Sequence, residues 1–400
     1  MIMNGTELNI QQRPRKSSLT GPAAARDAPW RRDPMADVRS IPETMRAAVY
    51  RERGRITVEQ RPVPMPGPHD VLLEVSHCGV CGTDLHMVME GWGRPDSIGG
   101  HEYSGRIVAL GSDIALGPAD QLGPADELGS ADENWKIGDA VVGGPPDPCG
   151  QCDPCRAGRA ALCIELGPAG VGEFQGAFAE YVKLTKRQLR RVPEGLDLRA
   201  AALAEPLAVA LHGITLAGVK PGQRALVTGV GPIGALTLAA LRAKGVEDIT
   251  VSEPLPLRRE LAAKLGASRV VEPDALEVPA MPFTVIDDAR QIAFECSGNP
   301  SAFEASLAQL DKLGTLVIVG TGMKWPRLDP NRVLLNELTI TGAYTYDDDG
   351  FEQALELLAS GEIPTDLLIE ASDVSLDGII EAMKGLVAGR LGGKVLVAPR

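Results

Sequence analysis

Short apolar runs separated by glycine and proline dominate the first half of the chain, at residues 47–50, 71–75 and 107–110. Such runs are typical of β-strands. From about residue 223 onward, apolar runs alternate with segments of helical periodicity. Strand–helix alternation predicts a parallel sheet with helices on both faces. The pattern therefore predicts an α/β chain in which a β-rich part precedes a doubly wound part.

The elements of the second half can be assigned one by one. Strands are expected at residues 224–228, 249–252, 292–295, 315–319 and 338–341. Helices are expected at residues 233–243, 258–265 and 302–313. The last part of the chain predicts helices near residues 350–360 and 376–387 and a strand at residues 394–397.

Two segments lack the periodicity of folded elements. Residues 1–44 are rich in proline and mildly basic, and they predict a disordered extension or an upstream start codon, with Met35 or Met45 nearer the true beginning. Acidic residues in this segment disfavour a targeting peptide. Residues 116–133 hold three near-copies of the unit Leu-Gly-Pro-Ala-Asp-Gln, within a low-complexity insert at residues 114–134. The copies are too polar to bury a core, which favours a mobile surface loop over a calcium site.

Composition and charge narrow the function. Of 400 residues, 44 % are hydrophobic and 23 % are charged, the balance of a globular protein long enough for two domains, or for one interrupted by another. A formal net charge of −13 disfavours nucleic acid as a partner. No uninterrupted apolar run reaches 18 residues, so no membrane span is expected. Seven cysteines, an odd number without a secretory signal, indicate metal ligation in a reducing compartment, so we expect a cytoplasmic protein.

Four cysteines form a compact group at residues 149–163: Cys149, Cys152, Cys155 and Cys163. Two-residue gaps on a loop stiffened by proline allow four thiolates to surround one tetrahedral Zn²⁺. An iron–sulfur run would close with a three-residue gap and Cys-Pro, whereas the last gap here has seven residues. Structural zinc is therefore favoured over an iron–sulfur cluster and over bridged or metal-free cysteines.

A second, dispersed group consists of Cys81 and the pair His101–Glu102. A thiolate, an imidazole and a carboxylate can hold zinc with one position open, which a catalytic site needs. By spacing alone the signal is weak, because a cysteine and a histidine 20 residues apart are usually ordinary core or surface residues.

A glycine-rich turn follows the strand expected at residues 224–228 and precedes a helix; its residues are Gly229, Gly231, Pro232, Ile233 and Gly234. Such a turn lets a pyrophosphate approach the N-terminus of the helix. Glu253 ends the next strand, where an acid accepts hydrogen bonds from ribose hydroxyls and repels a 2′-phosphate. The context predicts a dinucleotide, with NAD preferred. Arg258 is a candidate cofactor contact, a partner of Glu253 or a solvated charge at the start of a helix, and we favour the last.

These motifs, together with Cys-Gly-Thr-Asp-Leu-His at residues 81–86 and Glu-Pro-Leu at residues 205–207, resemble the zinc-dependent medium-chain alcohol and polyol dehydrogenases. The resemblance covers roughly residues 45–400. It implies a GroES-like, β-rich catalytic domain interrupted by a Rossmann domain. The implied division is a catalytic domain at residues 45–205, a Rossmann NAD-binding domain at residues 206–344 and a C-terminal return to the catalytic domain at residues 345–400.

The resemblance also implies the ligands of a catalytic zinc. Cys81 and His101 match ligands, and Glu102 matches a carboxylate beside the metal that can act as a ligand or support one. Glu205 stands where many alcohol dehydrogenases have a third cysteine, as in the sorbitol, threonine and glucose dehydrogenase branch. Whether Glu102 or Glu205 completes the site stays open.

The remaining roles concern protons and packing. Thr83 resembles the hydroxyl that takes the substrate proton, and His86 the far end of the proton relay. Asp84 is expected to orient the loop or the His101 ring. We expect Cys78 to be a small buried residue, and His212 to pack at the domain junction.

The implied reaction is the reversible oxidation of an alcohol or polyol to an aldehyde or ketone by NAD⁺, with two zinc ions per chain, one catalytic and one structural. The implied assembly is a homodimer or homotetramer. In the segment at residues 87–96, apolar Met87, Val88 and Met89 suit an aliphatic alcohol, whereas Arg94 suits a hydroxylated or acidic one. The alternative from another class is a catalytically silent homologue with a structural or regulatory role.

Overall fold

The computed structural model describes residues 30–31, 41–114, 134–144, 148–166, 175–346 and 350–400. The predicted repeat loop at residues 116–133 lies outside the described residues, as does most of the predicted N-terminal extension. Two residues of that extension, Trp30–Arg31 (β1), pair antiparallel with Gly111 and Leu110. Among the described residues, no helix is long and apolar enough to cross a membrane.

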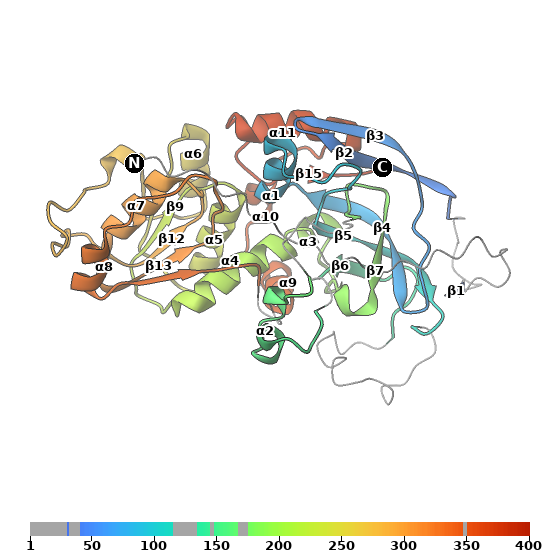
Figure 1. Ribbon diagram of the computed structural model, residues 1–400, viewed down its shortest axis with the longest axis horizontal. Helices are drawn as coiled ribbons and strands as arrows, with labels where there is room; N and C mark the ends of the chain where they lie inside the picture. The colour runs from blue at the N-terminus through green and yellow to red at the C-terminus, as the bar shows by residue number, and fades with distance from the viewer. Residues whose placement is uncertain (1–29, 32–40, 115–133, 145–147, 167–174, 347–349) are drawn as a thin grey trace, which may run out of the picture.

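A seven-stranded antiparallel sheet organises the first part of the chain (Figure 1). Its strands besides β1 are β4 (Asp70–Gly79), β5 (Glu102–Gly111), β6 (Ala140–Gly143), β7 (Tyr181–Thr185), β8 (Leu189–Arg191) and β15 (Leu396–Val397). Strands β2 (Thr44–Glu52) and β3 (Arg55–Pro62) form a separate hairpin. Because β15 pairs with β4, the last residues of the chain return to the sheet that its first half builds.

Short helices fill the connections of this first part. They are α1 (Gly82–Leu85), the π-helix η1 (His86–Glu90), α2 (Asp153–Arg156), α3 (Leu198–Ala201) and the 3₁₀ turns η4 (Ala160–Leu162) and η5 (Lys186–Gln188). The C-terminal return supplies α9 (Gly350–Ser360), α10 (Thr365–Leu368), η7 (Leu376–Gly378) and α11 (Ile379–Val387).

The second sheet has six parallel strands in the order β11-β10-β9-β12-β13-β14. They are β9 (Ala225–Thr228), β10 (Ile249–Ser252), β11 (Arg269–Val271), β12 (Arg290–Glu295), β13 (Leu310–Ile318) and β14 (Thr339–Gly342), connected through α5 (Pro232–Ala243), α6 (Pro256–Lys264), η6 (Pro273–Ala275), α7 (Pro300–Ala308) and α8 (Pro330–Asn336). This is the doubly wound order: β10 and β11 are added on one side of β9, and β12, β13 and β14 on the other. In such sheets dinucleotides bind at the switch point between the two directions, here between β9 and β12. The predicted α/β class and the two-part architecture are confirmed.

One predicted helix is shorter in the structure than expected. Residues 302–313 were expected to be helical, but α7 ends at Ala308 and β13 begins at Leu310. Leu310 pairs with Arg290 of β12, and Leu313 has a φ of +63°. A right-handed helix cannot contain that φ, so the chain has to leave the helix before this point.

Helix α4 (Ala204–Ala217) joins the two parts of the molecule (Figure 1). Its side chains Leu207, Leu211 and Ile214 share one buried core with the parallel sheet and α5. The helix is apolar on nearly every side, as expected of a helix enclosed by protein. Its first turn therefore has a fixed position relative to the start of α5, where the glycine turn lies.

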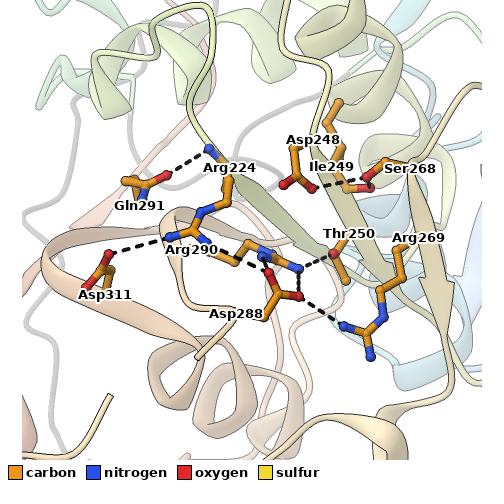
Figure 2. Close-up of polar contacts among 10 residues, drawn as sticks. All are labelled: Arg224, Asp248, Ile249, Thr250, Ser268, Arg269, Asp288, Arg290, Gln291 and Asp311. Atoms are coloured by element: carbon orange, nitrogen blue, oxygen red, sulfur yellow. Dashed lines mark hydrogen bonds and ion pairs between the residues drawn. The ribbon is translucent and has the colours of Figure 1, made fainter. Parts of the chain in front are cut away.

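A network of charges lies at the amino-terminal ends of the parallel strands, opposite the end that carries the glycine turn (Figure 2). Asp288 accepts hydrogen bonds from both Nη atoms of Arg290, at 2.5 and 2.7 Å, and Arg290 also donates to Thr250 at 2.7 Å. Arg269 and Arg224 lie within ion-pair distance of the same carboxylate. The guanidinium of Arg290, followed by those of Arg269 and Arg224, lowers the pKa of Asp288. The network holds the starts of β9, β10, β11 and β12 together.

Candidate active site

The loop after β4 presents Cys81 at the start of helix α1. The backbone N–H of Cys81 donates to Asp84 Oδ2 at 2.9 Å, which closes the first turn of the helix. The second oxygen of Asp84 accepts from the N–H of Gly100 at 3.3 Å. The buried Asp84 carboxylate therefore ties the loop of Cys81 to the residue before His101, which is the loop-orienting role predicted for it.

The antiparallel pairing of β4 with β5 explains how residues 20 positions apart meet. Gly79, the last residue of β4, lies opposite Glu102, the first residue of β5. Cys81 follows one strand and His101 precedes the other, so both lie at the same end of the ladder. The donor atoms of Cys81, His101 and Glu102 all lie within 4.8 Å of one another, which suits one metal ion. We call these three residues the dispersed cluster.

The charges around His101 favour a site that attracts a cation. Burial alone would lower the pKa of His101, but the Cys81 sulfur and the carboxylates of Asp84 and Glu205 raise it well above 6.5. Binding of a divalent metal would take over the role of the ring proton, because metal ligation needs a neutral imidazole and a thiolate. The donor set fits zinc, which is bound by cysteine sulfur, histidine nitrogen and carboxylate oxygen.

Glu205 lies in the first turn of α4 and is half-buried. It is not one of the described residues whose donor atoms lie within 4.8 Å of one another. Burial, with a smaller effect from Glu102, raises the pKa of Glu205 to about 7, while His101 and Lys394 act in the opposite direction. Glu205 is thus an electrostatic neighbour of the dispersed cluster in this structure.

Lys394 is the residue that the sequence analysis missed. Its Nζ donates to both carboxylate oxygens of Glu102, at 2.7 and 2.6 Å, and the two side chains are only 3 % and 1 % exposed. The lysine stands just before β15, 292 residues from its partner in sequence. A lysine between Gly-Gly and an apolar run was visible in the sequence, but its partner depends on the pairing of β15 with β4.

Thr83 lies beside the dispersed cluster, and His86 follows three residues later along the chain. Thr83 Oγ1 is 3.8 Å from Cys81 Sγ. His86 begins the π-helix η1, a wide turn that is often found at functional sites. Its ring stacks on Trp92, with 4.7 Å between centroids and an interplanar angle of 13°. Its Nδ1 lies 3.1 Å from Glu90 Oε1. The stacking restrains the imidazole on one face, while Nδ1 has a carboxylate nearby but no hydrogen bond in the described part of the chain.

The segment at residues 87–96, which we expected to line a substrate pocket, has a buried part and an exposed part. Met87 and Val88 are buried, and Val88 packs in the core of the antiparallel sheet. Trp92 and Arg94 are exposed. The apolar pair therefore contributes to folding, and the aromatic and basic side chains are the ones that a ligand can reach.

The four predicted cysteine ligands at residues 149–163 come together around helix α2. Their sulfur atoms lie within 4.8 Å of one another and none forms a disulfide. The N–H of Cys149 donates to Cys163 Sγ at 3.2 Å. Backbone N–H groups lower the pKa of Cys152 to about 6. Burial and side-chain hydrogen bonds with the neighbouring cysteines raise the pKa of Cys155 to about 12. Four sulfurs with no open position fit a closed zinc site.

This four-cysteine cluster also contacts the junction between the two parts. Arg159, which follows α2, lies with its Nη2 3.0 Å from His212 Nε2 and donates to the carbonyl of Tyr344 at 3.4 Å. His212 is 2 % exposed on α4. The prediction that His212 packs at the domain junction is confirmed. Cys78 is fully buried, which confirms the prediction made for it.

The glycine turn has the geometry that close backbone approach requires. Gly229 follows β9 with a φ of +82°, a conformation that favours glycine. A Cβ on Gly234 would lie 1.9 Å from the carbonyl oxygen of Gly229, so only glycine fits there. Helix α5 begins at Pro232, and its free N–H groups lie at the carboxyl end of β9.

Glu253 and Arg258 both lie close to this turn. Glu253 is buried at the end of β10 and accepts from the N–H of Val230 at 2.7 Å and of Leu255 at 2.9 Å. The guanidinium of Arg258 lies 3.7 Å from where a Cβ of Gly231 would be, and its Nε is buried without a hydrogen-bond partner in the described part of the chain. This placement differs from the solvated position that we favoured for Arg258.

Comparison with known proteins places these features in context. Residues 67–194 match the family model described as the alcohol dehydrogenase GroES-like domain, and residues 232–360 match the one described as zinc-binding dehydrogenase. Sorbitol dehydrogenase of Bacillus subtilis is 32 % identical over 86 % of this chain and 94 % of its own. A solved 2R,3R-butanediol dehydrogenase from Bacillus subtilis has a TM-score of 0.75 at 30 % identity, covering 89 % of this chain and all of its own. A Sinorhizobium meliloti structure described as a zinc-binding dehydrogenase bound to NADP has a TM-score of 0.76 at 31 % identity, covering 90 % and 100 %.

Proposed function

Because the chain belongs to the zinc-dependent medium-chain alcohol and polyol dehydrogenase family, we propose that it oxidises a secondary alcohol of a polyol or vicinal diol with NAD⁺. The chain is an oxidoreductase that uses zinc and a nicotinamide cofactor and acts on small alcohols or polyols. The observation that carries the proposal of zinc-dependent alcohol oxidation is the dispersed cluster, whose three donor atoms lie within 4.8 Å of one another. The silent alternative has no support, since the relatives are named as dehydrogenases.

Two zinc ions per chain are proposed. Cys81 and His101, with Glu102 or Glu205, would hold the catalytic ion, and the four-cysteine cluster would hold the structural one. When bound, the catalytic zinc supplies a Lewis acid that makes an alcohol hydroxyl more acidic, and the nicotinamide ring accepts a hydride. The residues of the chain supply the ligands, the orientation and the path for the proton.

The proton released by the alcohol is proposed to leave through Thr83 and His86. The Thr83 hydroxyl borders the dispersed cluster, 3.8 Å from Cys81 Sγ, and can both accept and donate a hydrogen bond. The half-buried His86 ring, stacked on exposed Trp92, can then hold the proton before it passes to solvent. A hydroxyl followed by an imidazole is a sequence of groups suited to such a transfer.

The cofactor is proposed to bind at the glycine turn. The pyrophosphate would meet the backbone N–H groups of Gly231, Ile233 and Gly234, where α5 begins. Gly229, whose N–H donates to the carbonyl of Ser252, and Pro232, which has no N–H, would shape the turn around it. Each oxygen of Glu253 accepts one backbone N–H and has capacity for a second bond from a ribose hydroxyl. A carboxylate there disfavours a 2′-phosphate, which supports NAD over NADP. The unpartnered Nε of Arg258 beside Gly231 supports a contact with the anionic cofactor.

A homodimer or homotetramer is proposed as the assembly. Strand β14 is the outer strand of the parallel sheet in the described part of the chain, so one of its edges has no partner strand. Leu334 and Leu335, on the adjacent α8, are exposed. The domain boundaries and the cytoplasmic location remain proposals based on the sequence.

The test is a panel of primary alcohols, secondary alcohols, polyols and aldoses, each assayed with NAD⁺ and with NADP⁺. We expect the highest kcat/KM for a polyol or vicinal diol with NAD⁺, at least about tenfold above the value with NADP⁺. Glu253→Gln should narrow that ratio, whereas Glu260→Gln, an exposed carboxylate on α6, should leave it unchanged. Turnover of primary alcohols alone, or preference for NADP⁺, would contradict the proposal.

A further inference from the structure

A buried carboxylate at the carboxyl end of the parallel sheet holds the turn that follows β12. Glu295, the last residue of that strand, is only 2 % exposed. Its Oε1 accepts from the N–H and the hydroxyl of Ser297, at 2.8 and 2.6 Å, and from the N–H of Gly298 at 3.0 Å. Its Oε2 accepts from the same N–H of Gly298 at 3.1 Å. Hydrogen bonds to an ionised carboxylate are strong, so the carboxylate gives residues 297–299, which we call the Ser297 turn, a fixed shape.

The Ser297 turn contacts the loops on both sides of it. A Cβ on Gly229, in the glycine turn after β9, would lie 2.6 Å from the Cβ of Ser297. A Cβ on Gly298 would lie 2.0 Å from the carbonyl oxygen of Thr321, and one on Gly322 would lie 1.9 Å from the carbonyl oxygen of Gly298. The neighbouring strands β9, β12 and β13 therefore end in segments whose backbones lie against one another with no room for additional side chains.

The outer side of this glycine-rich surface is accessible. Ser297, Asn299 and Thr321 are exposed and Gly298 is half-buried, whereas Glu295, which holds the turn, is buried. Backbone without side chains permits the close approach of a ligand. The Ser297 turn and the loop after β13 thus form an accessible floor at the carboxyl ends of the strands.

The position of this floor in the sheet indicates which half of a dinucleotide it would meet. Glu253, proposed to bind the adenosine ribose, ends β10 on one side of β9. The glycine turn proposed for the pyrophosphate follows β9 itself. A dinucleotide that crosses the switch point from β10 and β9 is directed with its nicotinamide half toward β12 and β13. The Ser297 turn lies on that side.

We infer that Glu295 is a positioning residue whose carboxylate holds the Ser297 turn as the floor for the nicotinamide half of the cofactor. The inference rests on the proposed function. Glu295 acts through the turn, because the carboxylate is buried and its hydrogen bonds go to Ser297 and Gly298. Without the carboxylate these donors lose their acceptor, and backbone donors without a partner are costly, so the turn should change its shape.

The test measures the Kd of two ligands for the full-length protein by calorimetry. NAD⁺ has both halves of the dinucleotide, whereas AMP has only the adenosine half. Glu295→Ala should raise the Kd of NAD⁺ about tenfold and leave the Kd of AMP within about twofold. Glu304→Ala is the matched control, because Glu304 lies on the following helix, α7, and accepts a backbone N–H from Arg327. It should leave both Kd values unchanged.

A second variant tests the same turn without opening a gap in the core. Ser297→Ala removes an exposed hydroxyl that donates to Glu295 and accepts from the N–H of Asn299 at 3.1 Å. It should raise the Kd of NAD⁺ about threefold and leave that of AMP unchanged. If Glu295→Ala does not fold, this variant decides the question.

The outcomes distinguish this inference from the proposed function. An unchanged Kd of NAD⁺ in folded Glu295→Ala, or in Ser297→Ala, overturns the positioning role. Equal weakening of NAD⁺ and AMP also overturns it, because the defect would then not be confined to the nicotinamide half. If the parent protein binds neither NAD⁺ nor AMP, the proposed cofactor site itself is wrong.

Discussion

The two clusters of metal donors in this chain are built in opposite ways. The four-cysteine cluster uses one residue type within 15 consecutive positions, and its sulfurs meet around a single short helix. The dispersed cluster combines sulfur, nitrogen and oxygen from the ends of two strands, with charged neighbours from α4 and from the segment just before β15. A local cluster stabilises its own loop, whereas a dispersed cluster exists only when the whole catalytic domain has folded.

The difference extends to what each cluster can do. Four sulfurs close the coordination of a zinc ion, so the four-cysteine cluster has no position for a substrate. The dispersed cluster has fewer donors and is bordered by a hydroxyl, Thr83, which an imidazole, His86, follows along the chain. Open coordination and nearby proton carriers belong together in catalysis. Separate loss of each cluster should therefore produce separate defects.

The largest expected effect is that of Cys81→Ala. Removing this ligand should lower kcat about 1,000-fold, which corresponds to roughly 4 kcal/mol of activation free energy. Binding of NAD⁺, measured by calorimetry, should persist, because the glycine turn lies on the other sheet. Cys78→Ala is the matched control, since Cys78 is buried three positions away and is not in the dispersed cluster; it should keep kcat within a few fold of the parent value. Equal losses in both variants would remove the distinction between the clusters.

The next effect is that of Cys155→Ala on stability. Loss of one of four sulfurs should release the structural ion and lower Tm by roughly 5–10 °C. Differential scanning calorimetry should show a larger fall than for Cys81→Ala. Because Arg159 connects this cluster to His212, the fall should come with a modest rise in KM for the cofactor. A Tm equal to that of the parent protein would mean that the four cysteines hold no metal.

The smallest effect comes from a region without metal donors. Asp288, whose pKa the neighbouring arginines lower, stabilises the fold above the pKa of the unfolded state, and this contribution is lost as the pH falls through the lower pKa of the folded state. Because Asp288 is half exposed, Asp288→Asn should cost only about 1 kcal/mol near neutral pH. Urea titrations from pH 7 down to pH 3 should show a shallower loss of stability than in the parent protein, and the metal content should not change. A steeper acid dependence would contradict this account of the network.

The same contrast explains what could be predicted from the sequence. The four-cysteine cluster was visible because its spacing is local, and the parallel sheet because each strand and helix has its own periodicity. The spacing of the residues in the dispersed cluster was only a weak sign of a metal site, and the family resemblance was needed to predict it. Lys394 was missed because its partner Glu102 is determined by the pairing of β15 with β4. The early end of α7 was missed because the positive φ of Leu313 leaves no mark in the hydrophobic pattern.

The central claim is that the chain holds two metal ions with different roles, one in each cluster. Native mass spectrometry of the intact parent protein and of Cys81→Ala tests it most directly, because it counts ions per chain without depending on any substrate. The account predicts two zinc ions per chain in the parent protein and one in Cys81→Ala. The same number of ions in both proteins would contradict it.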